Sequence, residues 1–234
     1  MRGDSVLIEA EGLSKIYRVG EVDVSALKAV DLKVARGEFT AIAGPSGSGK
    51  STLLNILSGL DTPSAGRVSL AGTPISEMGG RALSDFRRDH IGFIFQAYNL
   101  IPVLTVLENI EYVMLLQGVS RRVRRERVRE MLSTVGLEGM EDRRPPQLSG
   151  GQQQRVAVAR AMVSGPDLIL ADEPTANLDS ATGAALLDLM RELNECRGMT
   201  FLFSSHDRMI MDRAKRLVVL KDGSLVQDVT RSGP

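Results

Sequence analysis

The chain has 234 residues with 29 basic and 29 acidic side chains, so its formal net charge at neutral pH is zero. This length fits one large domain, and 43% hydrophobic residues are enough to build a buried core. The balanced charge argues against binding of nucleic acid mainly by bulk electrostatics, and the single Cys196 excludes an internal disulfide framework. No apolar stretch approaches the ~20 residues of a membrane-spanning helix, and residues 1–12 lack the apolar run of a signal peptide. Any membrane role should therefore come through a partner.

The N-terminal part of the chain has the patterns of several strands and one helix. Residues 6–13 and 29–37 alternate apolar and polar side chains, which predicts half-buried antiparallel strands. Residues 38–44 form a nearly continuous apolar run, typical of a strand buried on both faces. A glycine-rich loop then leads into residues 51–60, whose apolar side chains recur at helical spacing, and residues 67–75 predict an edge hairpin.

The pattern becomes helical between about residues 97 and 165, where 105–117 and 120–135 have apolar spacings near 3.6 and Gly136 fits a helix C-terminus. We expect the last residues, 231–234, to be frayed. Between residue 165 and this tail, the sequence predicts a strand at 167–172, a helix at 180–197 that ends before Gly198, and a strand at 199–207. A hairpin at 216–229 follows, with Asp222-Gly223 at its turn. Strands that alternate with helices at both ends predict an α/β fold with a helical insertion.

Residues 44–51, Gly-Pro-Ser-Gly-Ser-Gly-Lys-Ser, match the phosphate-loop pattern G-x-x-x-x-G-K-[ST]. Backbone N–H groups of such a loop approach phosphate oxygens, and the following helix directs its positive end at the anion. Lys50 would neutralise the β- and γ-phosphates, and the Ser51 hydroxyl would bind Mg²⁺. A chance Gly-Ser turn is the alternative, but the strand before the loop and the helix after it favour a nucleotide site. The expected contacts are Gly44, Pro45, Ser46, Gly47, Ser48, Gly49, Lys50, Ser51 and Thr52.

A second apolar strand, residues 168–171, ends in Asp172 and Glu173. If this strand lies parallel and adjacent to the strand before the phosphate loop, Asp172 reaches the same sheet edge, near Mg²⁺. Glu173, one residue further on, would accept a proton from an attacking water. Acidic residues after a strand are often only helix caps or solvated turns, and the phosphate loop is what favours the catalytic interpretation.

A second anion-binding device lies at residues 148–152, Leu-Ser-Gly-Gly-Gln. Ser149, Gly150 and Gly151 supply a hydroxyl and bare N–H groups at the start of a helical run that includes Gln152. An ordinary helix N-cap is the alternative. One nucleotide has no obvious need of two such devices so far apart in the sequence.

Taken together, these motifs resemble those of the nucleotide-binding subunit of ATP-binding cassette (ABC) transporters, and the resemblance covers essentially the whole chain. Residues 44–51 resemble the Walker A motif, 168–173 the Walker B motif and 148–152 the family signature. Three longer stretches, 26–66, 91–110 and 148–179, resemble the group that contains lipoprotein-releasing, macrolide-export and cell-division ATPases.

The resemblance implies a P-loop NTPase (RecA-like) α/β core with an N-terminal antiparallel β subdomain and an inserted α-helical subdomain. The whole chain, 1–234, would be a single ABC ATPase domain. Residues 1–96 and 166–234 would form the nucleotide-binding core with the β subdomain, and 97–165 the helical subdomain that carries the signature.

The resemblance extends to single positions outside these motifs. Gln96 matches the Q-loop glutamine that links Mg²⁺ and water to the helical lobe, and His206 matches the switch histidine between the γ-phosphate and the catalytic carboxylate. Asp179 matches the D-loop, with Ala176 where Gly or Ser is commoner. Tyr17 matches the aromatic residue that stacks on adenine, although a tyrosine in a hairpin is more often a packing residue.

These matches imply a complete hydrolytic set for ATP. Glu173, His206, Lys50 and Gln96 would be catalytic, and Ser51, Gln96 and Asp172 would surround Mg²⁺. The family's head-to-tail homodimer would hold each ATP between one chain's phosphate loop and the other chain's signature.

The implied partner is one or more integral membrane transporter subunits, in which ATP-driven closure of the dimer changes the conformation. The chain would then lie at the cytoplasmic face of the inner membrane, and we expect no nucleic-acid partner. The alternative is a soluble ABC ATPase that acts on DNA or ribosomes, but such proteins usually carry long coiled-coil insertions or two cassettes. A regulatory binder would be expected to lack Glu173 or His206, and a small GTPase would carry an N-K-x-D motif.

Two further segments have competing interpretations. Residues 121–129 hold six arginines, which suit lipid headgroups or nucleic acid. However, a stripe of Val123, Val128, Met131, Leu132 and Val135 predicts that these arginines lie on a solvated helix face. Apolar residues between 98 and 116 predict mainly a core, with a few between Tyr98 and Leu104 exposed to a partner's helix.

Overall fold

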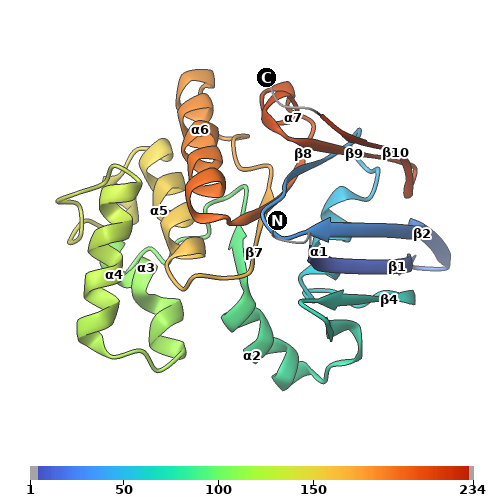
Figure 1. Ribbon diagram of the computed structural model, residues 1–234, viewed down its shortest axis with the longest axis horizontal. Coiled ribbons are helices and arrows are strands. Elements are labelled where there is room, and N and C mark those ends of the chain that lie inside the picture. Colours follow the sequence, from blue (N-terminus) through green and yellow to red (C-terminus); the bar gives the residue numbers. More distant parts are fainter. Residues whose placement is uncertain (1–4, 232–234) are drawn as a thin grey trace.

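The computed structural model describes residues 5–231; residues 1–4 and 232–234, three of which belong to the tail expected to be frayed, lie outside the described residues. Two sheets organise this part of the chain. One has four strands in the order β2-β1-β4-β5, and the other has six in the order β10-β9-β3-β8-β7-β6. Figure 1 shows helices α3, α4 and α5 on one side of β7 and the antiparallel strands β1, β2 and β4 on the other.

The antiparallel sheet contains a longer hairpin than the sequence pattern predicts. Its first strand continues to Val19 and its second begins at Val22, whereas alternation predicts strands only at 6–13 and 29–37. The hairpin tip is exposed, so no pattern of burial distinguishes its residues in the sequence. The expected edge hairpin at 67–75 is confirmed. The strands of this sheet are β1 (Val6–Val19), β2 (Val22–Ala35), β4 (Ala65–Leu70) and β5 (Thr73–Pro74).

The six-stranded sheet is parallel except for its edge strand β10, which forms a hairpin with β9 around Asp222-Gly223 as expected. The strand that ends in Asp172 is parallel to the strand before the phosphate loop, but the two are not adjacent. β8 lies between them and pairs with both, so the expectation of neighbouring strands is wrong. The strands are β3 (Phe39–Ala43), β6 (Ile91–Ile94), β7 (Leu168–Asp172), β8 (Thr200–Ser205), β9 (Arg216–Lys221) and β10 (Ser224–Thr230).

Five of the helices agree with the predicted segments, and the glycines expected to end two of them have left-handed backbone, with φ of 68° at Gly136 and 65° at Gly198. Two helices have no counterpart in the predictions. Of these, α2 buries only Leu83, and α7 has six residues. The helices are α1 (Lys50–Leu57), α2 (Gly80–His90), α3 (Val106–Leu116), α4 (Arg121–Thr134), α5 (Gly150–Met162), α6 (Ser180–Arg197) and α7 (Arg208–Arg213).

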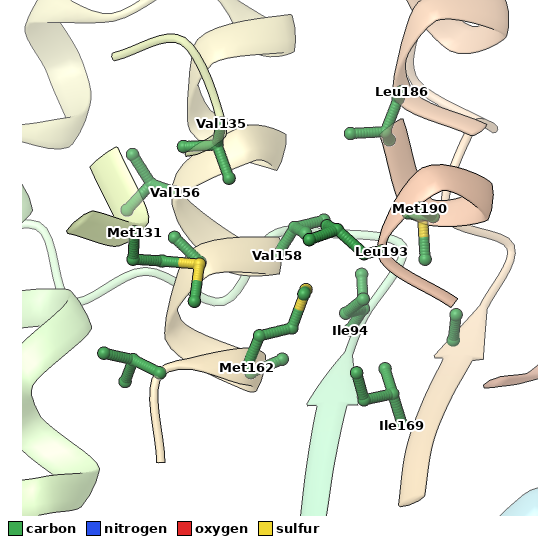
Figure 2. Packing of buried hydrophobic residues seen from close by; sticks show 14 of the residues in the cluster. Ile94, Met131, Val135, Val156, Val158, Met162, Ile169, Leu186, Met190 and Leu193 are labelled. Atoms are coloured by element: carbon green, nitrogen blue, oxygen red, sulfur yellow. The ribbon is translucent and has the colours of Figure 1, made fainter. Parts of the chain in front are cut away.

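Alternate side chains of the central strands enter two different hydrophobic clusters. Phe201 and Phe203 of β8 pack with Phe39 of β3 on the face that α5 and α6 cover, and the rings of Phe39 and Phe203 are 4.6 Å apart. Leu202 belongs to the cluster on the opposite face, with α1 and the antiparallel sheet. Figure 2 shows α5 side chains such as Val158 meeting the sheet and α6. The sheet is therefore fixed on both faces, and its strand ends can hold polar groups in defined positions.

The arginine-rich segment forms α4, and most of its basic side chains lie on a solvated face as favoured. Val128, Met131, Leu132 and Val135 are buried, whereas Val123 is half-buried. The exposed arginines are Arg121, Arg122, Arg127 and Arg129. Arg124 differs, because its Nε lies 3.0 Å from Glu111 Oε2 and both side chains are largely covered.

Candidate nucleotide and catalytic site

The phosphate loop joins β3 to α1, and backbone of other segments packs against it. Gly44 and Gly49 have φ of 155° and 101°. A Cβ on Gly44 would lie 2.2 Å from the carbonyl oxygen of Leu220, and one on Gly49 would lie 2.5 Å from that of Ala26. Only glycine fits at these two positions, because the neighbouring atoms are backbone that cannot swing away.

Lys50 lies folded over this loop. Its Nζ donates to the carbonyl oxygens of Gly44 at 2.8 Å and Pro45 at 3.0 Å. Gly47, Gly49, Ser51 and Thr52 line a small cavity of about 170 Å³ together with Lys50 and Ala26. The ammonium group is thus already placed where phosphate oxygens would replace carbonyl oxygens as its acceptors.

Asp172 reaches the phosphate loop even though β8 separates the two strands. Ser51 Oγ lies 3.3 Å from Asp172 Oδ1. Two hard oxygen donors side by side suit Mg²⁺, which is bound by one or two protein oxygens together with waters and phosphates. Residues 5–231 contain no group of three or more His, Cys, Asp or Glu side chains that could hold a metal ion by itself. Ser51 Oγ and Asp172 Oδ1 are oxygen donors of the kind that a magnesium ion accompanying a nucleotide would use.

Glu173 follows Asp172, and its carboxylate is held at both oxygens by the last residue of β8 and the residue after it. Ser205 Oγ donates to Glu173 Oε2 at 2.8 Å, and His206 Nδ1 lies 2.7 Å from Glu173 Oε1. The backbone at Glu173 has φ of 47°, a left-handed conformation that is strained for a residue with a side chain. The predicted proximity of Glu173 and His206 is therefore present, whereas the contact from Ser205 was not predicted. Its only signal in the sequence is its position beside His206.

Gln96 follows β6, the neighbour of β7, and so lies at the same edge of the sheet as Asp172. Its side chain is exposed, and its carbonyl oxygen accepts a hydrogen bond from Asn177 Nδ2 at 2.8 Å. Tyr98 and Asn99, just after it, both have left-handed backbone. The guanidinium group of Arg160 in α5 donates to both of their carbonyl oxygens, and burial lowers the pKa of this arginine.

The signature residues form the N-terminus of α5. Ser149 Oγ accepts a hydrogen bond from the N–H of Gln152 at 3.3 Å, and Gln152 Oε1 accepts one from the N–H of Ser149 at 2.9 Å. Gly150 and Gly151 face Tyr98 and Thr182 of the same chain. Figure 1 places α5 and α1 on opposite sides of β7, so one chain does not bring its signature to its own phosphate loop.

Asp179 caps α6 and uses its carboxylate locally. Its Oδ1 accepts from the N–H groups of Ala181 at 3.1 Å and Thr182 at 3.0 Å, and its Oδ2 accepts from Thr182 Oγ1 at 2.6 Å. These bonds, above all the one from the Thr182 hydroxyl, hold the pKa of the Asp179 carboxyl below its ordinary value. In the single chain, both oxygens of the Asp179 carboxylate accept local hydrogen bonds. The expected role of Asp179 in nucleotide binding therefore stays a prediction.

Tyr17 lies on β1 opposite Val24, with 37% of its surface exposed. Its hydroxyl donates to Asp61 Oδ2 at 2.7 Å, and the ammonium group of Lys15 lies 4.9 Å from the ring centroid. Burial, followed by the hydrogen bond to Asp61, raises the pKa of Tyr17. No pattern in the sequence marks Lys15 or Asp61 as partners of Tyr17.

Two larger cavities lie away from these residues. One of about 470 Å³ lies at the opposite ends of the parallel strands, beside Asp167 and Thr200, and contains none of the predicted site residues. Another of about 310 Å³ is mainly apolar and lies between α2, β6 and α3. No helix in residues 5–231 is both long enough and apolar enough to cross a membrane.

The family model of ABC transporters matches residues 27–176, which include the phosphate loop, the signature and the Asp172-Glu173 pair. The chain belongs to the ABC transporter family. It is an ATP-binding subunit of this family and an ATPase, as the sequence predicts. The expected P-loop α/β fold is confirmed by cassette structures of the family.

Relatives along the whole length support this membership. An uncharacterised ABC transporter ATP-binding protein of Thermotoga maritima is 48% identical over 227 residues, which cover 97% of this ABC ATPase and 96% of the relative. The lipoprotein-releasing system ATP-binding protein LolD of Chromohalobacter salexigens is 44% identical, with 96% and 95% covered. The macrolide export ATP-binding/permease protein MacB of Hahella chejuensis is 45% identical over 95% of this chain, which spans only 34% of MacB. The resemblance to lipoprotein-releasing and macrolide-export ATPases is therefore confirmed.

The solved cassette of MJ0796, described as a bacterial ABC transporter cassette in dimeric form, superposes with a TM-score of 0.90 at 43% identity. The match covers 97% of this ABC ATPase and all of the cassette. A second dimeric structure of MJ0796, in a post-hydrolysis state with ADP and Pi, also has a TM-score of 0.90, at 42% identity.

Proposed function

We propose that this ABC ATPase uses Glu173 as the general base for ATP hydrolysis, works as a head-to-tail homodimer, and drives a conformational change in a separate integral membrane subunit. The observation that carries the catalytic part is the carboxylate of Glu173. Ser205 and His206 hold it at both oxygens, one residue beyond the Asp172–Ser51 pair. A carboxylate has about four lone-pair directions, so Glu173 keeps acceptor capacity for a water molecule.

The phosphates of ATP would lie in the loop 44–52. There the Lys50 ammonium and the N–H groups at the start of α1 would stabilise the negative charge of the phosphates. Ser51, Asp172 and Gln96 would hold Mg²⁺, which when bound neutralises charge on the β- and γ-phosphates. Glu173 would orient the attacking water and accept its proton while the oxygen of this water bonds to the γ-phosphorus and ADP leaves. His206 would hold Glu173 and contact the transferred phosphate.

Dimerisation would complete the site. The partly exposed start of α5 offers N–H groups and the Ser149 hydroxyl to an anion, yet it does not reach the phosphate loop of its own chain. A second copy arranged head to tail would place its residues 149–152 against the γ-phosphate, with Asp179 nearby. Such an arrangement accounts for two anion-binding devices in one sequence, and the MJ0796 cassette forms a dimer.

The mainly apolar cavity beside α3 is the surface that we assign to the membrane subunit. Phe93, Phe95 and Leu116 line it, and arginines 87, 88 and 160 border it. A short amphipathic helix with an acidic residue suits this combination. Ile101 and Val103 are exposed as expected for a partner surface, but Tyr112, Leu115 and Leu116 of α3 are exposed as well and were not predicted to be.

Through this subunit the chain would lie at the cytoplasmic face of the inner membrane, with residues 97–165 as the lobe that transmits movement. Its relatives LolD and MacB support a system of the lipoprotein-release or export type, in which the cargo contacts the membrane subunit. ATP stabilises the closed dimer because it contacts two surfaces there and one in the open form.

Replacing the general base tests the proposal directly. We expect Glu173→Gln to lower steady-state hydrolysis at least about 100-fold, because proton transfer to a positioned base contributes this much or more. ATP binding should be preserved, and the dimer should persist with ATP in size-exclusion chromatography. The same variant with ATP should co-purify an integral membrane protein from solubilised membranes.

Glu192→Gln, an exposed change on α6, is the matched control and should behave as wild type. Unchanged hydrolysis in Glu173→Gln would exclude this residue as the base. Recovery of the protein only from a soluble pool bound to nucleic acid would instead favour an ABC ATPase that acts on DNA or ribosomes.

A further inference from the structure

The ring of Tyr17 is held mainly by a network centred on Asp61, and the side chain of Thr52 at the end of the phosphate loop also lies near the Tyr17 hydroxyl. Asp61 accepts hydrogen bonds from the Tyr17 hydroxyl at 2.7 Å and from Lys15 Nζ at 2.6 Å, one at each carboxylate oxygen. Lys15 Nζ also donates to the carbonyl oxygen of Thr62 at 2.7 Å. The side chain of Lys15 is 11% exposed, so this ion pair is mostly shielded from water.

Asp61 is in turn fixed to the end of α1, the helix whose first residue is Lys50. The N–H groups of Leu60 and Asp61 both donate to the carbonyl oxygen of Asn55 in the last part of this helix, at 2.8 Å and 3.1 Å. The N–H of Ser64 donates to Ser14 on β1 at 2.8 Å, so the segment after α1 runs along β1 beside Tyr17. The helix that starts at the phosphate loop therefore ends at the group that holds the Tyr17 hydroxyl.

The network also determines which face of the ring is available. The Lys15 ammonium lies 4.9 Å from the ring centroid, within the distance at which a cation is attracted to an aromatic face. Burial alone would raise the pKa of Asp61, but the hydrogen bonds from Lys15, Tyr17 and Thr62 outweigh it, and the pKa is lowered. Asp61 is therefore a carboxylate at neutral pH and a strong acceptor for the tyrosine hydroxyl.

We propose that Asp61 and Lys15 are positioning residues for base recognition, because they fix the Tyr17 ring to the end of α1 with one face left for the nucleotide base. This inference rests on the proposed ATP site and on the stacking of Tyr17 against adenine that the family resemblance implies. A ring held in advance at the correct orientation loses less conformational entropy when the base binds. The network would thus strengthen binding through the base alone and would leave the chemical step unchanged.

The test separates base binding from phosphate binding. The full-length chain and its variants are titrated calorimetrically with ADP and with inorganic tripolyphosphate, which has no base, and kcat is measured at saturating ATP. We expect Tyr17→Phe and Asp61→Ala each to raise the Kd for ADP about three- to tenfold, as loss of one charge-assisted hydrogen bond would. The double variant should bind ADP no more weakly than the single variant with the higher Kd, because both changes remove the same hydrogen bond. Tripolyphosphate binding and kcat should not change, and Asp188→Ala, which removes an ion-paired surface aspartate on α6, serves as the control.

Tyr17→Ala makes the possible failures distinguishable. If it leaves the Kd for ADP unchanged, Tyr17 does not contact the base, and both the expected stacking and this inference fail, while the proposed phosphate site is not affected. If it raises this Kd while Tyr17→Phe and Asp61→Ala bind ADP like wild type, the stacking role stands and only the positioning role is overturned. Equal weakening of ADP and tripolyphosphate by Asp61→Ala would also overturn it, because Asp61 would then support the phosphate loop. Tyr17→Phe keeps a half-exposed ring and is expected to fold, so the test remains decisive even if Asp61→Ala unfolds.

Discussion

At the scale of single residues, the environment of Glu173 comes from the end of a neighbouring strand. Ser205 Oγ donates to the Glu173 carboxylate and accepts a hydrogen bond from the N–H of Asp207 at 3.0 Å. The hydroxyl thus connects the proposed base to the backbone that leads into α7. A base is effective only where its acceptor direction is fixed toward the water, so Ser205 should influence the rate without contacting ATP.

Replacing Ser205 by Ala should therefore lower kcat for ATP hydrolysis about tenfold, which corresponds to one hydrogen bond to a charged group, and leave KM for ATP unchanged. Ser204→Ala is a closely matched control, because Ser204 Oγ is buried and has no hydrogen-bond partner in the described part of the chain. Steady-state kinetics give kcat and KM for ATP hydrolysis by the two variants. Equal rates for both would show that Ser205 has no part in holding Glu173.

Single residues also show which parts of the site can be predicted from the sequence. Lys50, Ser51 and Glu173 could be assigned because each lies inside a short pattern whose chemistry depends on the spacing. The contacts of Tyr17 with Asp61 and of Arg160 with Tyr98 could not be predicted, because they join residues separated by 44 and 62 positions. No local pattern encodes such pairs, since they depend on how separate elements pack.

At the scale of elements, strand types were predictable and strand order was not. Strands are predicted at β3, β7 and β8, and the continuous apolar run of β3 also correctly predicts burial on both faces. Their order in the sheet depends on the crossover connections, and β8, late in the sequence, inserts between the other two. This insertion brings Ser205 and His206 between the phosphate loop and Glu173. The position of β8 between β3 and β7 explains why β8 contributes to the site. The expectation of adjacent strands left this position out.

The C-terminal hairpin supports the same sheet through Arg216 of β9. Its guanidinium group contacts Asp228 of β10 at 2.7 Å and Glu38, just before β3, at 3.0 Å. The hydrogen bond from Arg216 is the main reason why the pKa of the Asp228 carboxyl lies below its ordinary value of 3.8. A folded-state pKa below the unfolded one means that the pair stabilises the fold above about pH 4, and that this contribution is lost as the pH falls through the folded value.

We therefore expect Asp228→Asn to lower the free energy of unfolding by about 1 kcal/mol at pH 7, a modest value because the pair is partly exposed. The difference from wild type should shrink as the pH falls below 3.8. Urea denaturation at pH 7 and at several pH values below 3.8 measures both. Asp142→Asn is the control, because Asp142 is exposed and has no ion pair among the described residues. It should change the free energy of unfolding little at either pH. A difference that is constant with pH would exclude the ion pair as its source.

At the scale of the whole molecule, zero net charge coexists with a site for a highly charged ligand. In the proposed dimer, the field at the phosphates would come from Lys50, the N–H groups of the loop and the starts of two helices, so it would not depend on net charge. One of these helices, α5, lies away from the loop in the same chain. The proposed active unit is therefore a pair of chains, and this can be tested without knowledge of the membrane subunit.

Two inactive variants should restore activity when they are mixed. Lys50→Ala removes the phosphate-loop charge, and Gly150→Asp places a carboxylate at the start of α5, where it repels phosphate but still suits the helix dipole. In a mixed dimer, one site contains both changes and the other contains neither. Equal mixing should give about a quarter of the wild-type ATPase rate, because half of the dimers are mixed and each has one intact site. Each variant alone should stay inactive. A mixture as inactive as its components would mean that each chain hydrolyses ATP with its own signature, which the separation of α5 from α1 argues against.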